Sequence, residues 1–262
     1  MQTSRDTTDL PTTPSLSLKG RRALVTGAGR GLGTALAAAL ASFGADVVLA
    51  ARSQDEVEAV AAAIRGQGGQ ASAVRLDVSD IDACAAFVES AEPFDILVNN
   101  AGTNRPGPFV ETRVEDYDLV LDLNVRATFF LSQAVARRLI AADRPGSIIN
   151  ISSQMGHVGA VVRTVYCATK HAVEGLTKAM AAELGPHGIR VNTTCPTFIE
   201  TPMTKPFFED AKFRDFVLGK IKLGRLGRPE DLMGAVVFLA SDASALMTGS
   251  ALMLDGGWTS TS

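Results

Sequence analysis

The fold is decided by residues 26–33, which read TGAGRGLG and lie between a short apolar run and an alanine-rich stretch. Glycines permit a tight turn and a close approach of the backbone to a ligand. The first N–H groups of a helix have no partner within the helix, and together with the helix dipole they attract a phosphate group. The stretch therefore predicts a strand, a phosphate-binding loop and a helix, in this order. The alternative interpretation is a strand-to-helix turn that binds nothing.

The same order of strand and helix repeats along the chain. Short β-rich runs alternate with longer stretches in which apolar residues have helical spacing, such as Leu32, Leu36 and Leu40. Several runs are continuously apolar, as a sheet covered on both faces requires. The pattern predicts an α/β protein with a single doubly wound (Rossmann) domain, a parallel seven-stranded sheet and helices on both faces. The expected strands are 22–26, 46–51, 71–76, 95–98, 147–151, 190–194 and 251–254.

The domain is expected to cover residues 16–262. Residues 1–15 are rich in Thr, Ser, Pro and Asp, which predicts a flexible N-terminal arm. Residues 202–223 are rich in Phe and Lys, and they interrupt the repeat before a helix that starts near Pro229. An insertion beside the carboxyl ends of strands is where a small helical lid over a substrate would lie.

The composition excludes several classes of function. The 262 residues are 46% hydrophobic and 20% charged, so the chain can bury a core and is not disordered throughout. A net charge of −3 offers no basic surface for nucleic acid. The three cysteines are far apart and form no CxxC pair, so no metal site is expected. We find neither an unbroken apolar run of about 18 residues nor an apolar leader, and expect a cytoplasmic protein with no membrane partner.

The spacing of the glycines indicates one family. Gly27, Gly31 and Gly33 are separated by three residues and then by one, unlike the common dinucleotide-binding fingerprint. This TGxxxGxG pattern near the N-terminus resembles the short-chain dehydrogenase/reductase family. The resemblance extends over about residues 16–258. It implies an NAD(P)-dependent oxidoreductase that interconverts a secondary alcohol and a ketone by hydride transfer.

The end of the second expected strand distinguishes NAD(H) from NADP(H). An Asp or Glu there would hydrogen-bond the ribose 2′-hydroxyl and repel a 2′-phosphate. This chain has Arg52 instead, and a second cation, Arg30, lies within the glycine loop. Guanidinium groups pair with phosphate through charge-assisted hydrogen bonds. NADP(H) is therefore the preferred cofactor and NAD(H) the alternative; the opposing interpretation makes both arginines solvated surface residues.

A candidate acid–base pair is formed by Tyr166 and Lys170, whose spacing places phenol and ammonium on one face of a helix. To move protons near neutral pH, a tyrosine pKa of about 10 must fall. An ammonium at about 4 Å supplies about 4 kcal/mol at an effective dielectric of 20, which is enough. The motif is common by chance, but Ser153 and Asn124 precede it in the family's order.

The resemblance assigns a role to each of these four residues. Tyr166 is the general acid/base, Lys170 tunes it and binds the nicotinamide ribose, and Ser153 anchors the substrate oxygen. Asn124 would hold a water that links Lys170 to a proton relay. An Asn in the middle of a helix is unfavourable by propensity, so its alternative interpretation is a buried kink.

The resemblance also implies cofactor contacts along the edge of the sheet. Asp77 matches the position that meets the adenine amino group, and its alternative role is the N-cap of the next helix. The turn at 196–201 is similar to the family's nicotinamide loop but has Thr197 in place of a glycine, and a branched residue disfavours positive φ. The expected cofactor-binding residues are Gly27, Arg30, Gly31, Leu32, Gly33, Arg52, Asp77, Val78, Asn100, Ala101, Gly102, Tyr166, Lys170, Pro196, Ile199 and Thr201.

The substrate is expected to be a small polar molecule. Arg105 could receive a carboxylate, and its alternative is a solvated loop arginine. This pattern is similar to the gluconate 5-dehydrogenase-like, sugar-acid branch of the family, which implies a sugar acid or a polyol. The expected substrate-binding residues are Arg105, Ser153, Gln154, His157 and Tyr166.

Two other functions stay open. A 3-oxoacyl-carrier-protein reductase would share the mechanism, but it needs a basic patch that the net charge of −3 does not indicate. A catalytically silent NADP(H)-binding sensor would not need the tyrosine, lysine and serine that are present. The resemblance further implies a homotetramer, a dimer of dimers, in which small residues at 168, 172, 179 and 182 permit close helix packing.

Overall fold

The computed structural model describes residues 10–202 and 204–260, which form one seven-stranded parallel sheet in the order β3-β2-β1-β4-β5-β6-β7. The strands are β1 (Arg22–Thr26), β2 (Asp46–Ala51), β3 (Gln70–Arg75), β4 (Ile96–Asn99), β5 (Gly146–Ile151), β6 (Ile189–Pro196) and β7 (Ala251–Leu254). Every expected strand starts within one residue of the observed strand. The largest difference is at β6, which continues to Pro196 because its last residues pair with β7.

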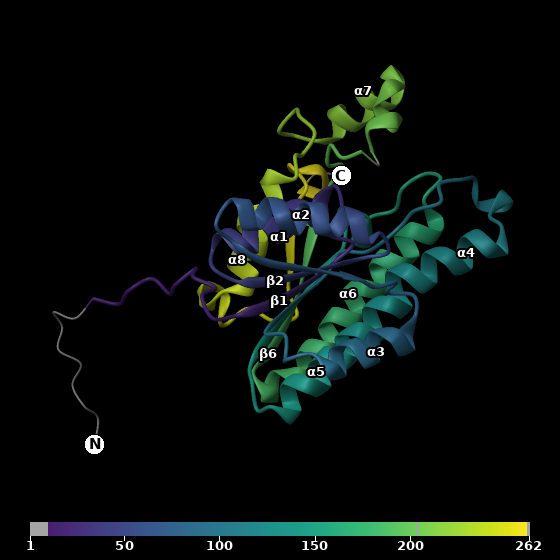
Figure 1. The fold of residues 1–262 in the computed structure, drawn as a ribbon. Helices are drawn as coiled ribbons and strands as arrows, with labels where there is room; N and C mark the ends of the chain where they lie inside the picture. Colours follow the sequence, from purple (N-terminus) through teal and green to yellow (C-terminus); the bar gives the residue numbers. More distant parts are fainter. Residues whose placement is uncertain (1–9, 203, 261–262) are drawn as a thin grey trace.

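Helices cover both faces of the sheet (Figure 1). The helices are α1 (Leu32–Ser42), α2 (Gln54–Gly66), α3 (Ile81–Ser90), α4 (Val114–Leu121), α5 (Ala127–Ala141), α6 (Thr164–Leu184), α7 (Ala211–Lys220) and α8 (Glu230–Ala240). One buried apolar cluster joins α1, α2 and α8 to the sheet, and a second joins α3, α5 and α6 to its other face. The doubly wound fold expected from the sequence is confirmed.

The strand order reverses between β1 and β4, which are neighbours in the sheet although β2 and β3 separate them in the sequence. In open α/β sheets, ligands bind outside the carboxyl ends of the strands at such a switch point. The glycine loop follows β1 and residues 100–102 follow β4, so both lie at this point. The fold therefore places the candidate phosphate loop where a ligand is expected.

The expected lid contains a 3₁₀ turn, Lys205–Glu209, and helix α7; one of its residues, 203, lies outside the described residues. In Figure 1 α7 projects from the body of the domain. Its inner side belongs to a small apolar cluster that contains Phe198, Phe213, Val217 and Trp258. The segment thus has its own packing and is joined to the end of β6 through Phe198.

Part of the expected N-terminal arm, residues 1–9, lies outside the described residues. Residues 10–15 are exposed and form neither helix nor strand, and they extend away from the sheet (Figure 1).

One helical stretch, Val114–Ala141, is long and apolar enough to cross a membrane by length and composition. From the sequence we expected no such segment, because we looked for an unbroken apolar run. This stretch is apolar on average but is interrupted by Asp122 and Arg126. Its residues Leu131, Val135 and Leu139 are buried in the core beneath the sheet. We therefore interpret it as a core helix of the domain.

Candidate active site

The glycine loop has the shape of a phosphate cradle. Gly27 and Gly31 have φ of 62° and 60°, a region that L side chains rarely adopt. A Cβ at Gly33 would lie 2.3 Å from the carbonyl oxygen of Gly27, so only glycine fits there. Helix α1 starts at Leu32 with no side-chain cap and no acidic residue in its first turn. The loop and the free N–H groups of α1 therefore fit the pyrophosphate of a dinucleotide.

Residues after β4 hold the glycine loop in place. Asn100 Nδ2 donates hydrogen bonds to the carbonyl oxygens of Thr26 and Gly27, at 2.9 and 3.2 Å. The backbone N–H groups of Asn100 and Ala101 both donate to Thr26 Oγ1. These four bonds join the two strands at the switch point. Gly102, next in the chain, lies against Asn124, because a Cβ there would be 3.2 Å from Asn124 Oδ1.

The structure brings a carboxylate to the expected 2′-phosphate site. Arg30 and Arg52 are both exposed. Arg30 lies 4.0 Å from Glu56, which belongs to the first turn of α2. Glu56 was not predicted from the sequence, because it follows the end of the second strand by several residues. In the folded protein it lies so close to the glycine loop that a Cβ at Gly29 would be 2.9 Å from it. This weak, exposed ion pair leaves the guanidinium accessible to a stronger anion.

Asp77 lies beyond β3, at the expected adenine end of the site. Its carboxylate accepts hydrogen bonds from the N–H and O–H groups of Ser79. Burial acts to raise the pKa of Asp77, but the bonds from Ser79 and the charge of Arg52 outweigh it and hold that pKa below its usual value. The alternative role as helix N-cap is wrong, because Asp80 caps α3 instead. The neighbouring Val78 is buried.

The phenol of Tyr166 and the ammonium of Lys170 lie together on α6, with Lys170 Nζ 5.4 Å from the centre of the Tyr166 ring. Lys170 Nζ donates to the carbonyl oxygen of Ile151 at 2.8 Å, and it has two further N–H donors. Burial lowers the pKa of Lys170 to about 8. Burial also raises the pKa of Tyr166 to about 12, against the lowering effect of a hydrogen bond with Ser153.

This result corrects the expectation that Lys170 alone brings the tyrosine pKa toward neutrality. The polypeptide's own groups leave Tyr166 protonated at neutral pH, because desolvation of the phenolate exceeds what they supply. A protonated phenol is the form that donates a proton to a ketone oxygen.

The Ser153 side chain follows β5 and lies in a tight hydrogen-bonded turn. Ser153 Oγ donates to Gln154 Oε1 at 2.7 Å and accepts from the N–H of Met155. Gln154 is 1% exposed, and its Nε2 has no hydrogen-bond partner among the described residues. A buried amide donor without a partner, next to a hydroxyl that contacts the phenol, can bind a polar group of a substrate.

Asn124 lies in a π-helical turn, Asp122–Arg126, that interrupts the continuous helix of α4 and α5. Its Oδ1 accepts from the N–H of Thr103, and its Nδ2 donates to the Thr103 carbonyl oxygen and to Thr169 Oγ1. Such π-turns are rare and are frequent at functional sites. The side-chain amide of Asn124 thus joins the loop after β4 to helix α6. Thr169, the residue of α6 that accepts this hydrogen bond, was not predicted from the sequence.

The expected nicotinamide loop comprises residues 196–201. Ile199 is buried, and Thr201 lies close to the glycine loop, since a Cβ at Gly31 would be 3.7 Å from it. Among the described residues, only Asp143 and Val162 combine a positive φ with a side chain, so Thr197 takes the glycine position without backbone strain. Thr197 Oγ1 is buried and has no partner in the part of the chain that the structure describes.

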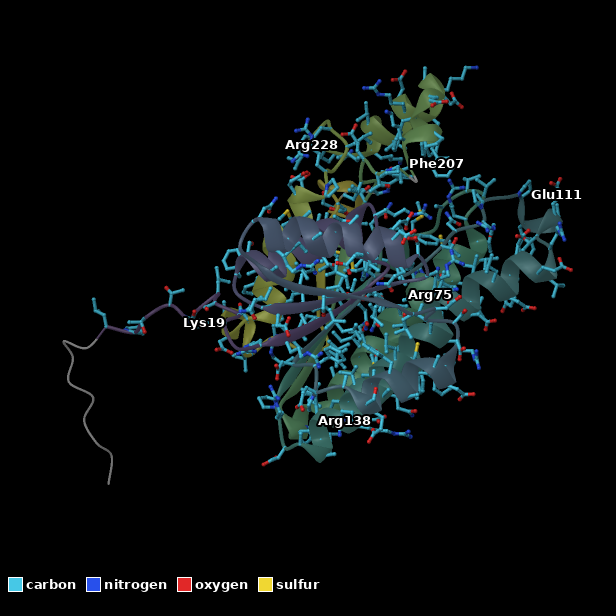
Figure 2. The ribbon with its side chains drawn as sticks, viewed as in Figure 1. Lys19, Arg75, Glu111, Arg138, Phe207 and Arg228 are labelled. Atoms are coloured by element: carbon cyan, nitrogen blue, oxygen red, sulfur yellow. The ribbon has the colours of Figure 1, made fainter. Side chains whose placement is uncertain are left out.

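The structure separates the expected substrate-binding residues. Arg105 is exposed and lies 3.5 Å from Asp116 of α4, so its charge is already partly paired. His157 is half-exposed and lies near Glu174 and Cys195. The buried arginine of this region is Arg163, whose guanidinium lies 5.7 Å from the ring of Phe207. Phe207 belongs to the expected lid and is labelled in Figure 2.

Arg163 is held in an unusual backbone environment. The preceding Val162 has φ of 53°, which is strained for a β-branched residue. Arg163 donates to the Val162 carbonyl oxygen, and no carboxylate pairs with it among the described residues. Burial lowers the pKa of Arg163, while the neighbouring Cys167 and Tyr166 act to raise it. Sequence spacing could not show that Arg163 is buried beside the tyrosine.

A cradle that fits a dinucleotide, next to a phenol–lysine pair at the switch point of a doubly wound sheet, defines an NAD(P)-dependent oxidoreductase that acts on CH–OH groups. The chain belongs to the short-chain dehydrogenase/reductase family: its residues 27–259 match the family profile described as enoyl-(acyl carrier protein) reductase. The family and the class of enzyme expected from the sequence are confirmed.

Several characterised proteins are similar over nearly the whole chain. D-erythrulose reductase from Gallus gallus is 42% identical over 94% of this chain and 98% of its own length. Gluconate 5-dehydrogenase from Gluconobacter oxydans is 42% identical over 93% of this chain and 96% of its own. L-xylulose reductase from Bos taurus is 42% identical over 94% and 99%, respectively.

A solved structure of gluconate 5-dehydrogenase from Burkholderia cenocepacia, in complex with NADP and tartrate, has a TM-score of 0.91 to this protein. It is 37% identical, and the match covers 94% of this chain and 98% of that one.

Proposed function

We propose that this protein is an NADP(H)-dependent reductase that interconverts a ketone and a secondary alcohol on a sugar, a polyol or a sugar acid. The observation that carries the proposal is the phenol of Tyr166, which lies beside Ser153 and Lys170 at the edge of the sheet that holds the glycine loop. The geometry provides a proton donor, a second hydroxyl and a cation around one position.

Each side chain around this position has a separate role in the reaction. Ser153 and Tyr166 bind the substrate oxygen, and Tyr166 donates its proton to that oxygen during reduction. Lys170 stabilises the resulting phenolate by its charge and uses its two free N–H donors for the nicotinamide ribose. NADP(H) supplies the hydride when it is bound. Asn124 positions the loop after β4 against α6, and its second Oδ1 lone pair can hold the proposed relay water.

The preference for NADP(H) rests on two exposed guanidinium groups. Arg30 and Arg52 lie at the ends of the glycine loop and of β2, and neither forms a close ion pair with an acidic group of the described chain. The 4.0 Å separation of Arg30 from Glu56 is long for a salt bridge. The complex of the Burkholderia relative with NADP supports the same cofactor here. The other cofactor-binding residues expected from the sequence would contact the dinucleotide between Asp77, at the adenine end, and Thr201, at the nicotinamide end.

A polar substrate is supported by two buried donors near Tyr166. The unpartnered Nε2 of Gln154 suits a hydroxyl or a carboxylate, because leaving it unpaired costs free energy. Arg163 provides a buried positive charge under the lid, and we place a substrate carboxylate there in preference to Arg105. The relatives that reduce D-erythrulose and L-xylulose or oxidise gluconate support this substrate class.

We also propose that the protein assembles as a cytoplasmic homotetramer. The outer faces of α4 and α5 carry exposed Tyr117, Leu119, Phe129 and Phe130. The small residues at 168, 172, 179 and 182 of α6 are exposed and so are available for a partner helix. Sedimentation equilibrium tests the assembly: Phe130→Glu should shift the protein toward monomers, whereas a wild-type monomer would contradict the proposal.

The function is tested by the absorbance of reduced nicotinamide. D-erythrulose, L-xylulose, 5-ketogluconate and a 3-oxoacyl thioester are offered separately, each with NADPH and with NADH. We expect turnover of the sugar ketones with NADPH, and a loss of at least about tenfold in NADPH preference in Arg52→Gln, because a phosphate-pairing guanidinium is removed.

The other outcomes decide between the alternatives. Turnover of the thioester alone would identify a carrier-protein reductase and contradict the polar-substrate proposal. Measurable NADPH binding with no turnover of any substrate would favour the sensor. A preference for NADH in the wild type would contradict the roles given to Arg30 and Arg52.

A further inference from the structure

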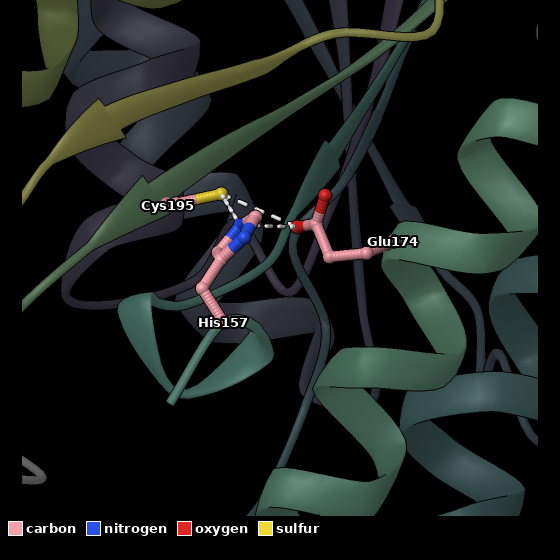
Figure 3. Close-up of side chains that lie close together, drawn as sticks. All are labelled: His157, Glu174 and Cys195. Atoms are coloured by element: carbon pink, nitrogen blue, oxygen red, sulfur yellow. Dashed lines mark hydrogen bonds and ion pairs between the residues drawn. The ribbon is translucent and has the colours of Figure 1, made fainter. Parts of the chain in front are cut away.

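Three side chains that can bind a metal meet beside the active site (Figure 3). His157 follows the 3₁₀ turn Gln154–Gly156, Glu174 lies on α6 and Cys195 lies on β6. Three separate elements therefore bring together an imidazole, a carboxylate and a thiol. The sequence predicted no metal site, because spacing along the chain cannot reveal a cluster made from residues so far apart.

The distances within this cluster match one face of a metal tetrahedron. With metal–ligand bonds of about 2.0–2.2 Å to nitrogen or oxygen and about 2.3 Å to sulfur, tetrahedral ligands lie about 3.3–3.7 Å apart. Cys195 Sγ lies 3.4 Å from His157 Nε2 and 3.2 Å from Glu174 Oε1. His157 Nε2 lies 3.6 Å from Glu174 Oε1. All three edges fit within a few tenths of an ångström, so an ion can be held without rearranging the backbone.

The surroundings of the cluster support a bound cation. Cys195 is fully buried and the Glu174 side chain is 8% exposed, while His157 is 32% exposed and provides a route from solvent. Thr193 Oγ1 donates to the second carboxylate oxygen, Glu174 Oε2, at 3.0 Å. Ligating carboxylates are commonly oriented by such a hydrogen bond. The thiol and the carboxylate can carry two negative charges, which a divalent cation would neutralise.

A nearby hydroxyl gives an independent indication of a polar ligand. Ser152 is 2% exposed, and its Oγ has no hydrogen bond among the described residues beyond a loose contact with the Cys195 thiol. A Cβ at Gly156 would lie 3.0 Å from this oxygen and 3.1 Å from Glu174 Cγ, so the hydroxyl is next to the cluster. Buried hydroxyls are normally satisfied, and a water on a bound metal would provide the missing partner.

We propose that His157, Glu174 and Cys195 form a binding site for a zinc-type divalent cation, with water in the fourth position. This set of one nitrogen, one oxygen and one sulfur ligand suits Zn²⁺ or Co²⁺. Mg²⁺ and Ca²⁺ prefer oxygen ligands alone and should not compete.

Binding breaks the S–H bond of Cys195 and forms a metal–sulfur bond, and the released proton leaves to solvent. Without the metal the thiol of Cys195 donates a hydrogen bond to Glu174 Oε1 at 3.2 Å, so the thiol proton is present before binding. About one proton should be released per metal ion bound, with the His157 ring entering as the neutral imidazole.

An occupied site would affect the reaction through two neighbours. The ion occupies the lone pair of His157 Nε2 and so removes this side chain from the substrate pocket. It also compensates the negative charge of Glu174, which acts to raise the pKa of Lys170. We expect Zn²⁺ to inhibit the enzyme; this consequence rests on the proposed function, whereas the metal site itself does not.

The site is tested on the full chain with Co²⁺, whose bond to a thiolate gives a near-ultraviolet charge-transfer absorption. Wild type and the control variants Cys84→Ser and His187→Gln should each bind one equivalent with this absorption. Cys195→Ser should lose the absorption, and His157→Gln and Glu174→Gln should bind at least about tenfold more weakly. Calorimetry with Zn²⁺ in two buffers of different ionisation enthalpy counts the released proton.

Each remaining outcome contradicts the site. A wild type that takes up no Co²⁺ or Zn²⁺ in about a tenfold molar excess would leave a hydrogen-bonded triad and no metal site. Equal binding by Cys195→Ser and wild type would place the ion elsewhere on the surface. Because Cys195 is buried, its variant is first checked by circular dichroism; if it does not fold, His157→Gln, at the half-exposed position, decides the question without it.

Discussion

The glycine loop and the segment from Phe198 to Leu226 lie at the same edge of the sheet, but they are built by different means. The loop is shaped by backbone: two glycines with positive φ, a third that leaves no room for a Cβ, and a helix start without a side-chain cap. The segment is shaped by side chains, with Phe198 in contact with Phe208, Phe213 and Trp258. A site formed by backbone groups is specific for one chemical group, here a phosphate. A site formed by side chains, such as the segment from Phe198 to Leu226, can change its specificity when those side chains are substituted.

Tyr166→Phe should have the largest effect on activity, because it removes the proposed proton donor of the reaction. Removing a general acid costs about 10²–10⁴-fold, so we expect kcat to fall about 10³-fold. NADPH affinity, measured by fluorescence titration, should stay within about threefold, because the glycine loop is untouched. A variant that keeps a tenth of the wild-type kcat would show that another group donates the proton.

Gly33→Ala tests the backbone-built region directly. The new Cβ would lie 2.3 Å from the carbonyl oxygen of Gly27, so the loop must shift. We expect a loss of about 1–3 kcal/mol in the free energy of unfolding and a clear drop in NADPH affinity. The matched control is Gly234→Ala on the exposed side of α8, where a Cβ meets nothing within 4 Å.

That control should be stabilised by about 0.5–1 kcal/mol, because alanine is the better helix former. If the two variants had equal stability and equal NADPH affinity, the close packing of the loop would not matter for binding.

The same contrast explains how much the sequence could predict. The strands, the order of the elements and the glycine loop depend on local patterns, so their positions were predicted to within two residues. Glu56 and Thr169 reach the site from helices whose side-chain directions depend on packing, and no local pattern marks them. We expected Lys170 to lower the pKa of Tyr166, whereas in the protein without cofactor, burial raises it. The desolvation penalty that causes the rise depends on burial, which the sequence does not show.

The pH dependence of reduction reports on the buried lysine. With a pKa of about 8, Lys170 loses its positive charge as the pH rises above 8, whereas an exposed lysine would keep it to about 10. The phenolate formed during reduction then loses its stabilisation. We expect kcat/KM for ketone reduction to be level below pH 8 and to fall by up to about tenfold per unit above it. Lys170→Arg should move the fall to higher pH; an unchanged profile would exclude Lys170 as its cause.

Phe198→Ala tests the segment from Phe198 to Leu226, and it should have the smallest effect of the four predictions made here. Phe198 connects the end of β6 to the aromatic cluster, so its loss should loosen α7 without moving the glycine loop. We expect KM for the sugar substrate to rise about threefold to tenfold, with NADPH affinity unchanged, since about 1 kcal/mol of aromatic contact is lost. Phe43→Ala, an exposed aromatic residue at the end of α1, is the control. If Phe198→Ala weakened NADPH as much as it raised KM, the two regions would form one binding surface, and substrate specificity could not vary independently of the cofactor.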